Sequence, residues 1–170
     1  MARSLEAEFM KVYEEHSDAI FRYCYFRLYN REKAKDMAQE AFLKAWGYLK
    51  NGNQVDNLRA FIYRVANNLI IDHVRKKKET SLEVMEEAGF QPSIDGEAEQ
   101  AIRIDGIFLQ ETLQEIEEEY RDVVYMRYIE GLQPREIAEI LGESVNVISV
   151  RIHRGLKKLK IVLEKKYVHK

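Results

Sequence analysis

A long stretch without any basic residue limits the possible folds of this chain more than any other feature. No lysine or arginine occurs between Lys78 and Arg103, although the 170 residues include 27 of them. The same stretch holds seven acidic residues, one proline and two glycines, a composition typical of linkers. Apolar residues recur at helical spacing on both sides of it. We therefore expect an all-α protein with two small helical domains, residues 1–78 and 105–170. An acidic linker at residues 79–104, with at most a short helical turn near residues 82–88, is expected to join them.

The charge of the chain is segregated in a similar way. Residues 1–78 carry 15 Lys and Arg against 10 Asp and Glu, residues 79–142 carry 4 against 17, and residues 143–170 carry 8 against 2. The formal net charge of −2 therefore conceals two basic segments, which are suited to contact phosphate. The alternative is that these segments are solvated helix faces that happen to differ in sign.

The first domain is expected to consist almost entirely of helices. The segment "EKAKDMAQEAFLKAWGYL" carries apolar residues three and four positions apart, which is the spacing of one helix face. Turn-forming residues in "NGNQVDN" then interrupt the pattern. The next segment, "LRAFIYRVANNLIIDHVRKKK", is expected to be a helix that ends in four basic residues. Its expected buried face consists of Leu58, Ile62, Val65, Ala66 and Leu69.

In the second domain, residues that typically begin and end helices occur at the spacing of a helix-turn-helix. A helix is expected from about residue 102 to residue 120, and another is expected to end at Gly131. Pro134 suits the first turn of a short helix, Gly142 suits a left-handed cap at its end, and Ser144 suits the cap of the helix that follows. This last, basic helix is expected to bury one apolar stripe: Val145, Ile148, Ile152, Leu156, Leu159 and Leu163. A short helix, a tight turn and a longer basic helix together predict a DNA-binding motif.

The composition excludes several classes of protein. No run approaches the ~18 apolar residues that span a bilayer, and the N-terminus lacks the apolar segment of a signal peptide. We therefore expect a cytoplasmic protein without a membrane partner. The single cysteine, Cys24, cannot form an internal disulfide or a metal cluster. The four histidines are scattered and no carboxylates have metal-ligand spacing, so neither a cofactor nor an enzymatic activity is expected.

Three motifs occur together in one order along the chain. They are "AKDMAQEAFLKAW", "LRAFIYRVANNLIIDHVRKKK" and "YRDVVYMRYIEGLQPREIAEILG…VRIHRGLKKL". Over about residues 9–165 the chain resembles the bacterial sigma-70 family, specifically its extracytoplasmic-function (ECF) group. The resemblance implies a factor that binds core RNA polymerase and directs promoter recognition and transcription initiation. It implies that residues 1–78 dock on polymerase and open the minus-10 element, and that residues 105–170 read the minus-35 element.

The resemblance also implies which residues of the first domain bind partners. On "DMAQEAF", the polar residues Asp36, Gln39 and Glu40 are implied to dock on the largest polymerase subunit; the alternative is ordinary solvated helix charge. Asn68 is implied to lie near a pocket for a flipped base of the non-template strand, under the loop "GNQVDNL". The candidate minus-10 contacts are Arg59, Tyr63, Arg64, Asn67, Asn68, Arg75, Lys76, Lys77 and Lys78. Alternatively, Tyr63 belongs to the core and the two asparagines satisfy neighbouring backbone groups.

The candidate minus-35 contacts lie on the outward face of the last helix. They are Asn146, Val147, Ser149, Val150, Arg151, His153, Arg154, Lys157 and Lys158. The usual family sequence Pro-Val-Gly-Thr-Val-Lys-Ser-Arg is replaced here by Ser-Val-Asn-Val-Ile-Ser-Val-Arg at residues 144–151, so the promoter sequence is not carried over. A proline common in the family before "EEYR" is likewise replaced, by Glu117. We expect the valines to touch thymine methyl groups, Asn146 and Ser149 to address base edges, and the basic side chains to hold phosphate.

Other partners and other functions follow from the same residues. The resemblance implies an anti-sigma protein that holds the factor inactive. The acidic linker either mimics nucleic acid in a basic channel of the polymerase or is a simple spacer. One rival function is a helix-turn-helix regulator that acts without polymerase, which leaves both motifs of the first domain unexplained. The others are a helical nuclease or recombinase, for which no catalytic cluster is present, and an adaptor that binds neither DNA nor polymerase.

Overall fold

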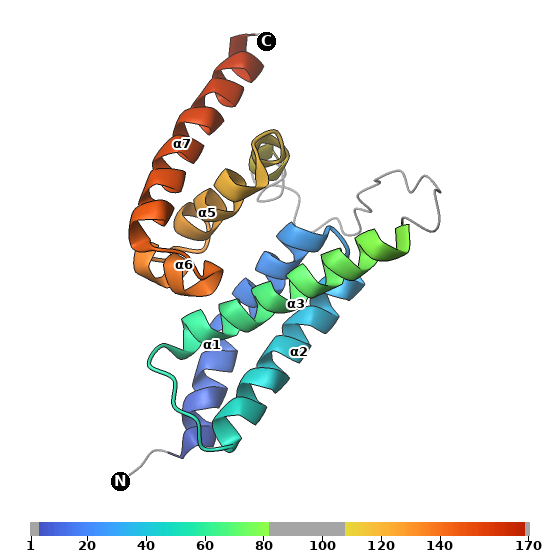
Figure 1. The fold of residues 1–170 in the computed structure, drawn as a ribbon, viewed down its shortest axis with the longest axis vertical. Coiled ribbons are helices and arrows are strands. Elements are labelled where there is room, and N and C mark those ends of the chain that lie inside the picture. Colours follow the sequence, from blue (N-terminus) through green and yellow to red (C-terminus); the bar gives the residue numbers. More distant parts are fainter. Residues whose placement is uncertain (1–3, 82–107, 169–170) are drawn as a thin grey trace. The chain divides into compact units, whose positions relative to one another are not determined.

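The structure, a computed structural model, describes residues 4–81 and 108–168 (Figure 1). All regular secondary structure within these two ranges is helical, and they fall into two compact units. We call these the N-terminal unit and the C-terminal unit. The prediction of an all-α fold with two helical domains is confirmed. The expected helical turn near residues 82–88 and most of the linker lie outside the described residues.

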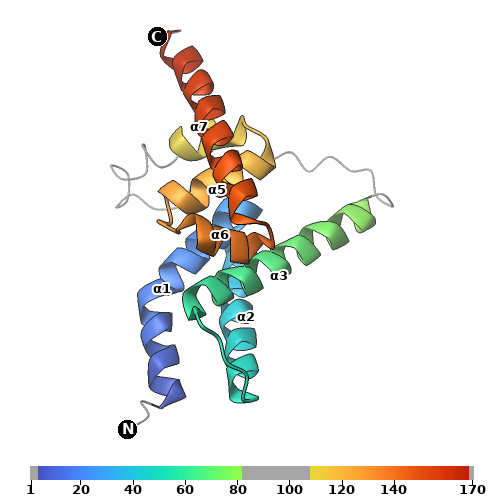
Figure 2. The same cartoon turned by 60° about the vertical axis from the view of Figure 1, so that its left-hand side comes forward.

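The N-terminal unit contains α1 (Leu5–Leu28), α2 (Arg31–Lys50) and α3 (Leu58–Ser81). The three helices lie side by side, as both ribbon views show (Figure 1, Figure 2). Short polar side chains begin the helices: the Asn30 amide oxygen accepts the Lys33 N–H at 3.0 Å, and that of Asn57 accepts the Ala60 N–H at 3.0 Å. Such caps satisfy N–H groups that have no partner within the helix. They explain why the chain breaks at these two points.

The core of the N-terminal unit differs in one respect from the prediction. Ile62 and Ala66 are buried as expected, but Leu58, Val65 and Leu69 are only half-buried. Ala60, Asn67 and Ile70 are also buried, although the predicted buried face left them out. Tyr63, which the sequence placed in the core only as an alternative, is buried as well. The buried face of α3 therefore includes two residues with polar groups, Tyr63 and Asn67. They can be buried because α1 supplies a hydrogen-bonding partner for Asn67 and an aromatic partner for Tyr63.

The C-terminal unit contains a helical segment at residues 108–114, followed by α5 (Glu118–Tyr128), α6 (Pro134–Leu141) and α7 (Val145–Val168). The prediction of one helix continuing to residue 120 is wrong, because the chain turns at residues 115–117. There the Glu115 and Ile116 N–H groups bond to the carbonyl oxygens three residues earlier, at 3.1 and 3.3 Å. The tighter turn buries both Leu113 and Ile116.

The helix-turn-helix is confirmed, including the residues that begin and end its helices. Gly131 and Gly142 both adopt a φ of 67°, in the left-handed region that favours glycine. Pro134 is the first residue of α6, and the Ser144 hydroxyl accepts the Val147 N–H at 3.2 Å at the start of α7. The prediction that Val145 is buried is wrong: it is 45% exposed. The covered part of the stripe begins only at Ile148, since Val145 is the first residue of α7.

Helices α5 and α7 pack very closely at Gly155, which is buried within α7. A Cβ atom added there would lie 2.6 Å from Val124 Cγ2 and 3.1 Å from the Tyr120 carbonyl oxygen. The absence of a side chain at this position therefore allows the two backbones to approach. This contact fixes how α7 is held against α5.

Candidate nucleic-acid interface

Helix α2 presents a polar face away from its alanine-rich buried side. Asp36, Gln39 and Glu40 are all exposed, as their spacing predicts. Leu43 lies on the same face, three residues after Glu40, and is 70% exposed. Sequence reasoning missed Leu43 because it attended to the core stripe, although helical spacing from Asp36, at i and i+7, would have placed it there. The face thus combines two carboxylates and an amide with one apolar side chain.

Helix α3 presents a continuous outward stripe with the spacing four, three, four and three. Its members are all exposed: Arg64, Asn68, Ile71, Arg75 and Lys78. Lys76 and Lys77 extend the positive charge around the end of the helix and are also exposed. Arg59 is half-buried, at the first turn of α3. The stripe is therefore a basic surface that has one amide and one apolar side chain in its middle.

Two predicted minus-10 contacts do not lie on this surface. Tyr63 is completely buried and Asn67 is 4% exposed. The Asn67 amide oxygen accepts hydrogen bonds from the Tyr23 hydroxyl at 3.2 Å and from Arg27 Nη1 at 3.0 Å, and the Tyr23 and Tyr63 rings pack edge to face 5.5 Å apart. The expectation that these two side chains touch DNA is therefore wrong, and the alternative that Tyr63 belongs to the core is what the structure shows. The partners of Asn67 are side chains, not the neighbouring backbone groups of the other alternative. Tyr63 and Asn67 join α3 to α1, and so orient the neighbouring Asn68 outward.

Neither of the ionisable side chains His73 and Asp72, which lie near the α3 stripe, prevents this surface from binding phosphate. The pKa of His73 is lowered, first by partial burial and then by the positive charges of Lys33 and Lys77. His73 is therefore neutral at neutral pH and adds no charge. Arg75 forms an exposed ion pair with Asp72 at 3.1 Å, which water and salt weaken strongly. The arginine can exchange this partner for phosphate at little cost.

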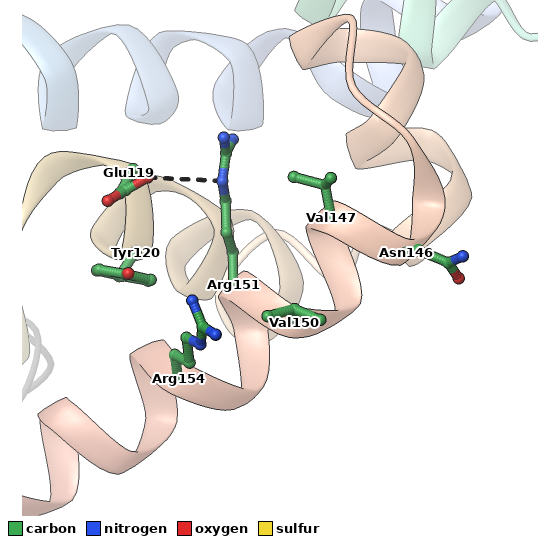
Figure 3. A pocket seen from close by; sticks show the side chains of 7 residues that line it. All are labelled: Glu119, Tyr120, Asn146, Val147, Val150, Arg151 and Arg154. Atoms are coloured by element: carbon green, nitrogen blue, oxygen red, sulfur yellow. Dashed lines mark ion pairs between the residues drawn. The ribbon is translucent and has the colours of Figure 1, made fainter.

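The outward residues of α7 lie where helical geometry predicts. Seven of the nine candidates are exposed: Asn146, Val147, Ser149, Val150, His153, Arg154 and Lys157. Arg151 and Lys158 are half-buried. Asn146, Val147, Val150, Arg151 and Arg154 line an open groove between α7 and the start of α5, which has a volume of about 400 Å³. Figure 3 shows these side chains. The lining of the groove also includes Glu119 and Tyr120 of α5, which sequence reasoning did not assign to this surface.

A ladder of ion pairs joins the segment before and at the start of α5 to α7. The Glu119 carboxylate lies 3.7 Å from Arg151 Nε (Figure 3), the Glu117 carboxylate lies 2.8 Å from Lys158 Nζ, and Glu115 pairs with Lys166. The hydrogen bond between Glu117 and Lys158 lowers the pKa of the carboxyl and raises that of the amine. Nothing in the sequence pairs residues so far apart, so no pattern could have shown these contacts.

Comparison with known proteins identifies the family. Residues 12–80 match the family model for sigma-70 region 2, and residues 109–159 match that for sigma-70 region 4. The chain is 32% identical over 163 residues to the ECF RNA polymerase sigma factor SigW of Bacillus subtilis, across 89% of this chain and 87% of the relative. This chain belongs to the ECF sigma factors. As such it binds core RNA polymerase and directs promoter recognition and transcription initiation, and it is not an enzyme.

Other relatives and solved structures agree with this assignment. The sigma factor is 28% identical to RNA polymerase sigma factor SigV of Bacillus subtilis, across 89% of this chain and 88% of the relative. Its fold is similar to that of the sigma factor RpoE in a co-crystal structure with the anti-sigma factor NepR from Bartonella quintana. The TM-score is 0.77 at 19% identity, over 92% of this chain and 97% of the other. A structure of CnrH with the cytosolic domain of CnrY gives 0.71 at 22% identity, over 95% and 91%.

The described residues of this sigma factor contain neither a membrane-spanning helix nor a metal-binding cluster. No helix in residues 4–81 or 108–168 is both long and apolar enough to cross a membrane. Within the same ranges, no group of three or more His, Cys, Asp or Glu side chains could hold a metal ion. The rival function of a regulator that acts without polymerase is not favoured, because both sigma regions match.

Proposed function

We propose that this ECF sigma factor divides its task among three helix faces. The face of α2 with Asp36, Gln39 and Glu40 docks on core polymerase, the stripe on α3 engages the minus-10 element, and the outward face of α7 engages the minus-35 element. The observation that carries the proposal is the exposure of these faces, since every member of the α2 face and of the α3 stripe is open to solvent. Run-off transcription with core polymerase on a promoter library tests it. Transcripts that start downstream of two shared elements are expected, and transcription independent of sequence would contradict the proposal.

The α2 face suits a basic protein partner. Asp36 and Glu40 are one helical turn apart, and Lys44 neutralises Glu40 only across an exposed ion pair of 3.5 Å. Leu43 adds an apolar centre to a polar surface, which is the usual anatomy of a protein–protein interface. We therefore infer that Leu43 is buried when core polymerase binds, while the carboxylates meet Arg or Lys of the partner.

The α3 stripe suits a strand that has left the duplex. Phosphate-binding side chains, Arg64 and Arg75, lie on either side of Asn68 and Ile71 along the helix. An asparagine can both donate and accept hydrogen bonds at a base edge, and an exposed apolar side chain can contact the face of an unstacked base. The buried network of Asn67 supports this arrangement from below, since it fixes the rotation of α3 about its axis.

Replacing Asn68 by alanine is expected to impair initiation on duplex promoters. The defect should be largest when the minus-10 base that Asn68 contacts is present, and smaller on a premelted bubble with a different base there, because the contact forms only after the base is flipped. Transcript yield on the two templates measures this. Asn67→Ala is the matched control: it removes a buried hydrogen-bonding group, so it should lower the melting temperature and impair every template equally. The assignment of Asn68 fails if Asn68→Ala behaves in the same way.

The outward face of α7 is suited to contact duplex DNA, although it has few polar side chains with which to recognise bases. Val147 and Val150 are 36% and 46% exposed and can touch thymine methyl groups, while Asn146 and Ser149 can address base edges. Arg154 and Lys157 form no ion pair within residues 108–168. We assign these two side chains to phosphate.

Two kinds of α7 variant are expected to behave differently. Arg154→Ala or Lys157→Ala should weaken binding to all sequences and reduce the salt slope by about one unit each. Val150→Ala or Ser149→Ala should change the preferred bases by roughly 1 kcal/mol or less, since neither side chain makes a bidentate pair. Selection from randomised minus-35 DNA measures both effects. An unchanged motif for Val150→Ala would show that Val150 does not read DNA.

We further propose that the factor acts in the cytoplasm and is held inactive by an anti-sigma protein. The support is that solved structures with a similar fold include a sigma factor bound to the anti-sigma factor NepR and CnrH bound to the cytosolic domain of CnrY. Co-purification from cells of the producing species tests this. A stoichiometric partner that is displaced by core polymerase is expected, and recovery of the factor free of any such partner would contradict it.

A further inference from the structure

One basic residue of the proposed minus-35 surface is already bound to carboxylates. Arg151 Nε lies 3.7 Å from Glu119 of α5, and its Nη2 lies 3.2 Å from Glu143 in the turn before α7. The side chain is only 24% exposed, whereas the two carboxylates are 54% and 38% exposed. Two different elements of the unit therefore enclose the guanidinium.

The position of this cluster decides its consequence. Arg151 borders the groove together with Val147, Val150 and Arg154 (Figure 3), residues that we assign to the DNA-facing side. The carboxylates are thus close to where phosphate or base edges would come. Unlike Arg75, which is 64% exposed and pairs with one carboxylate, Arg151 is shared by two carboxylates. Its charge is already largely neutralised, so contact with DNA releases few counterions.

We propose that Glu119 and Glu143 hold Arg151 in place of DNA phosphate, and so keep the affinity of the minus-35 surface below what its positive charge alone would give. This inference depends on the proposed role of α7. The pair of Glu117 and Lys158, one ladder position away, repeats the same arrangement at 2.8 Å. The affinity of α7 for DNA is thus set partly by acidic residues outside α7.

The test is a gain of binding, which damage to the structure does not produce. The variant Glu119→Gln with Glu143→Gln removes both charges and nearly preserves side-chain shape. The matched control is Glu111→Gln with Glu139→Gln, which removes two exposed carboxylates of the same unit that form no ion pair within residues 108–168. Holoenzyme assembled with the full chain is titrated with a duplex that carries only a selected minus-35 element, and with a random duplex, between 0.1 M and 1 M salt.

We expect the Glu119→Gln, Glu143→Gln variant to bind both duplexes more tightly. One additional phosphate contact steepens the salt slope by about 0.9, which corresponds to roughly an eightfold gain in affinity on going from 1 M to 0.1 M salt. The selected motif should not change, since phosphate contacts carry no sequence information. Adding Arg151→Ala should abolish the gain, because the released charge is then missing.

Three results would overturn the proposal. The first is a gain in affinity no larger than that of the Glu111→Gln, Glu139→Gln control. The gain would then result from the changed net charge alone and not from the release of Arg151. The second is a gain that persists with Arg151→Ala, and the third is a changed motif, which would make Arg151 a base-reading residue. Failure of the proposed function is distinguishable: Arg154→Ala in the unaltered chain would then leave both affinity and salt slope unchanged.

Discussion

Asp36→Arg combined with Glu40→Arg is expected to reduce the affinity for core polymerase by at least about a hundredfold. Both side chains are exposed on α2, so stability should change by no more than about 0.5 kcal/mol. Reversing two charges against a basic partner creates like-charge contacts that cost several kcal/mol. Affinity for core polymerase and melting temperature, measured on the same preparation, check both parts of the expectation.

The matched control is Glu14→Arg combined with Asp18→Arg on α1. These residues are also acidic, exposed and four positions apart, so the net charge and its local density change in the same way. The control should retain core binding within a fewfold range. Equal loss in both double variants would indicate a general charge effect, and no loss in either would show that another face docks on the polymerase.

Gly155→Val is expected to destabilise the C-terminal unit by about 3 kcal/mol. An added Cβ would already approach Val124 Cγ2 to 2.6 Å and the Tyr120 backbone oxygen to 3.1 Å, so α5 and α7 must separate to admit a side chain. Overpacking of this kind typically costs about 1–3 kcal/mol, and a backbone atom cannot rotate away as a side chain can. We expect loss of minus-35 binding and a lower unfolding midpoint for this unit in urea.

Gly47→Val is the control for intrinsic helix propensity. Gly47 also lies inside a helix, α2, but a Cβ built on it has nothing within 4 Å. The substitution there should be close to neutral, because valine and glycine differ by only a few tenths of a kcal/mol in helix propensity. If the two variants were equally stable, the close approach of α5 and α7 at Gly155 would be ruled out.

Local chemistry made the helix-turn-helix predictable, and the lack of it explains why the turn that ends the helix at residue 114 was not predicted. Gly131, Pro134, Gly142 and Ser144 each favour a particular backbone conformation, and each adopts the expected role. The turn at residues 115–117 has neither glycine nor proline. It forms because Leu113 and Ile116 are both buried by tertiary packing, which overrides local preference.

The site was predictable where exposure follows from helical spacing and unpredictable where it depends on partners. The outward positions on α2 and α7 come directly from the period of the helix. Asn67 and Asn68 are adjacent and identical in type, and Asn67 is the one that is buried and bonded to Tyr23 and Arg27 of another helix. In the same way, the partners of Arg151 come from α5 and from the turn before α7. Helical periodicity in the sequence does not relate these residues to Arg151.

Because Cys24 is buried, its modification by a thiol reagent reports how often the N-terminal unit opens. The Cys24 side chain is completely enclosed, and burial raises the pKa of the thiol to about 12, so almost no reactive thiolate exists in the folded state. It is the only cysteine in the chain. The rate at which a thiol reagent modifies the native protein therefore counts openings of this unit alone. If Gly155→Val leaves the rate of Cys24 modification unchanged, the loss of stability is confined to the C-terminal unit. This can be measured in the full chain, without cutting the two units apart.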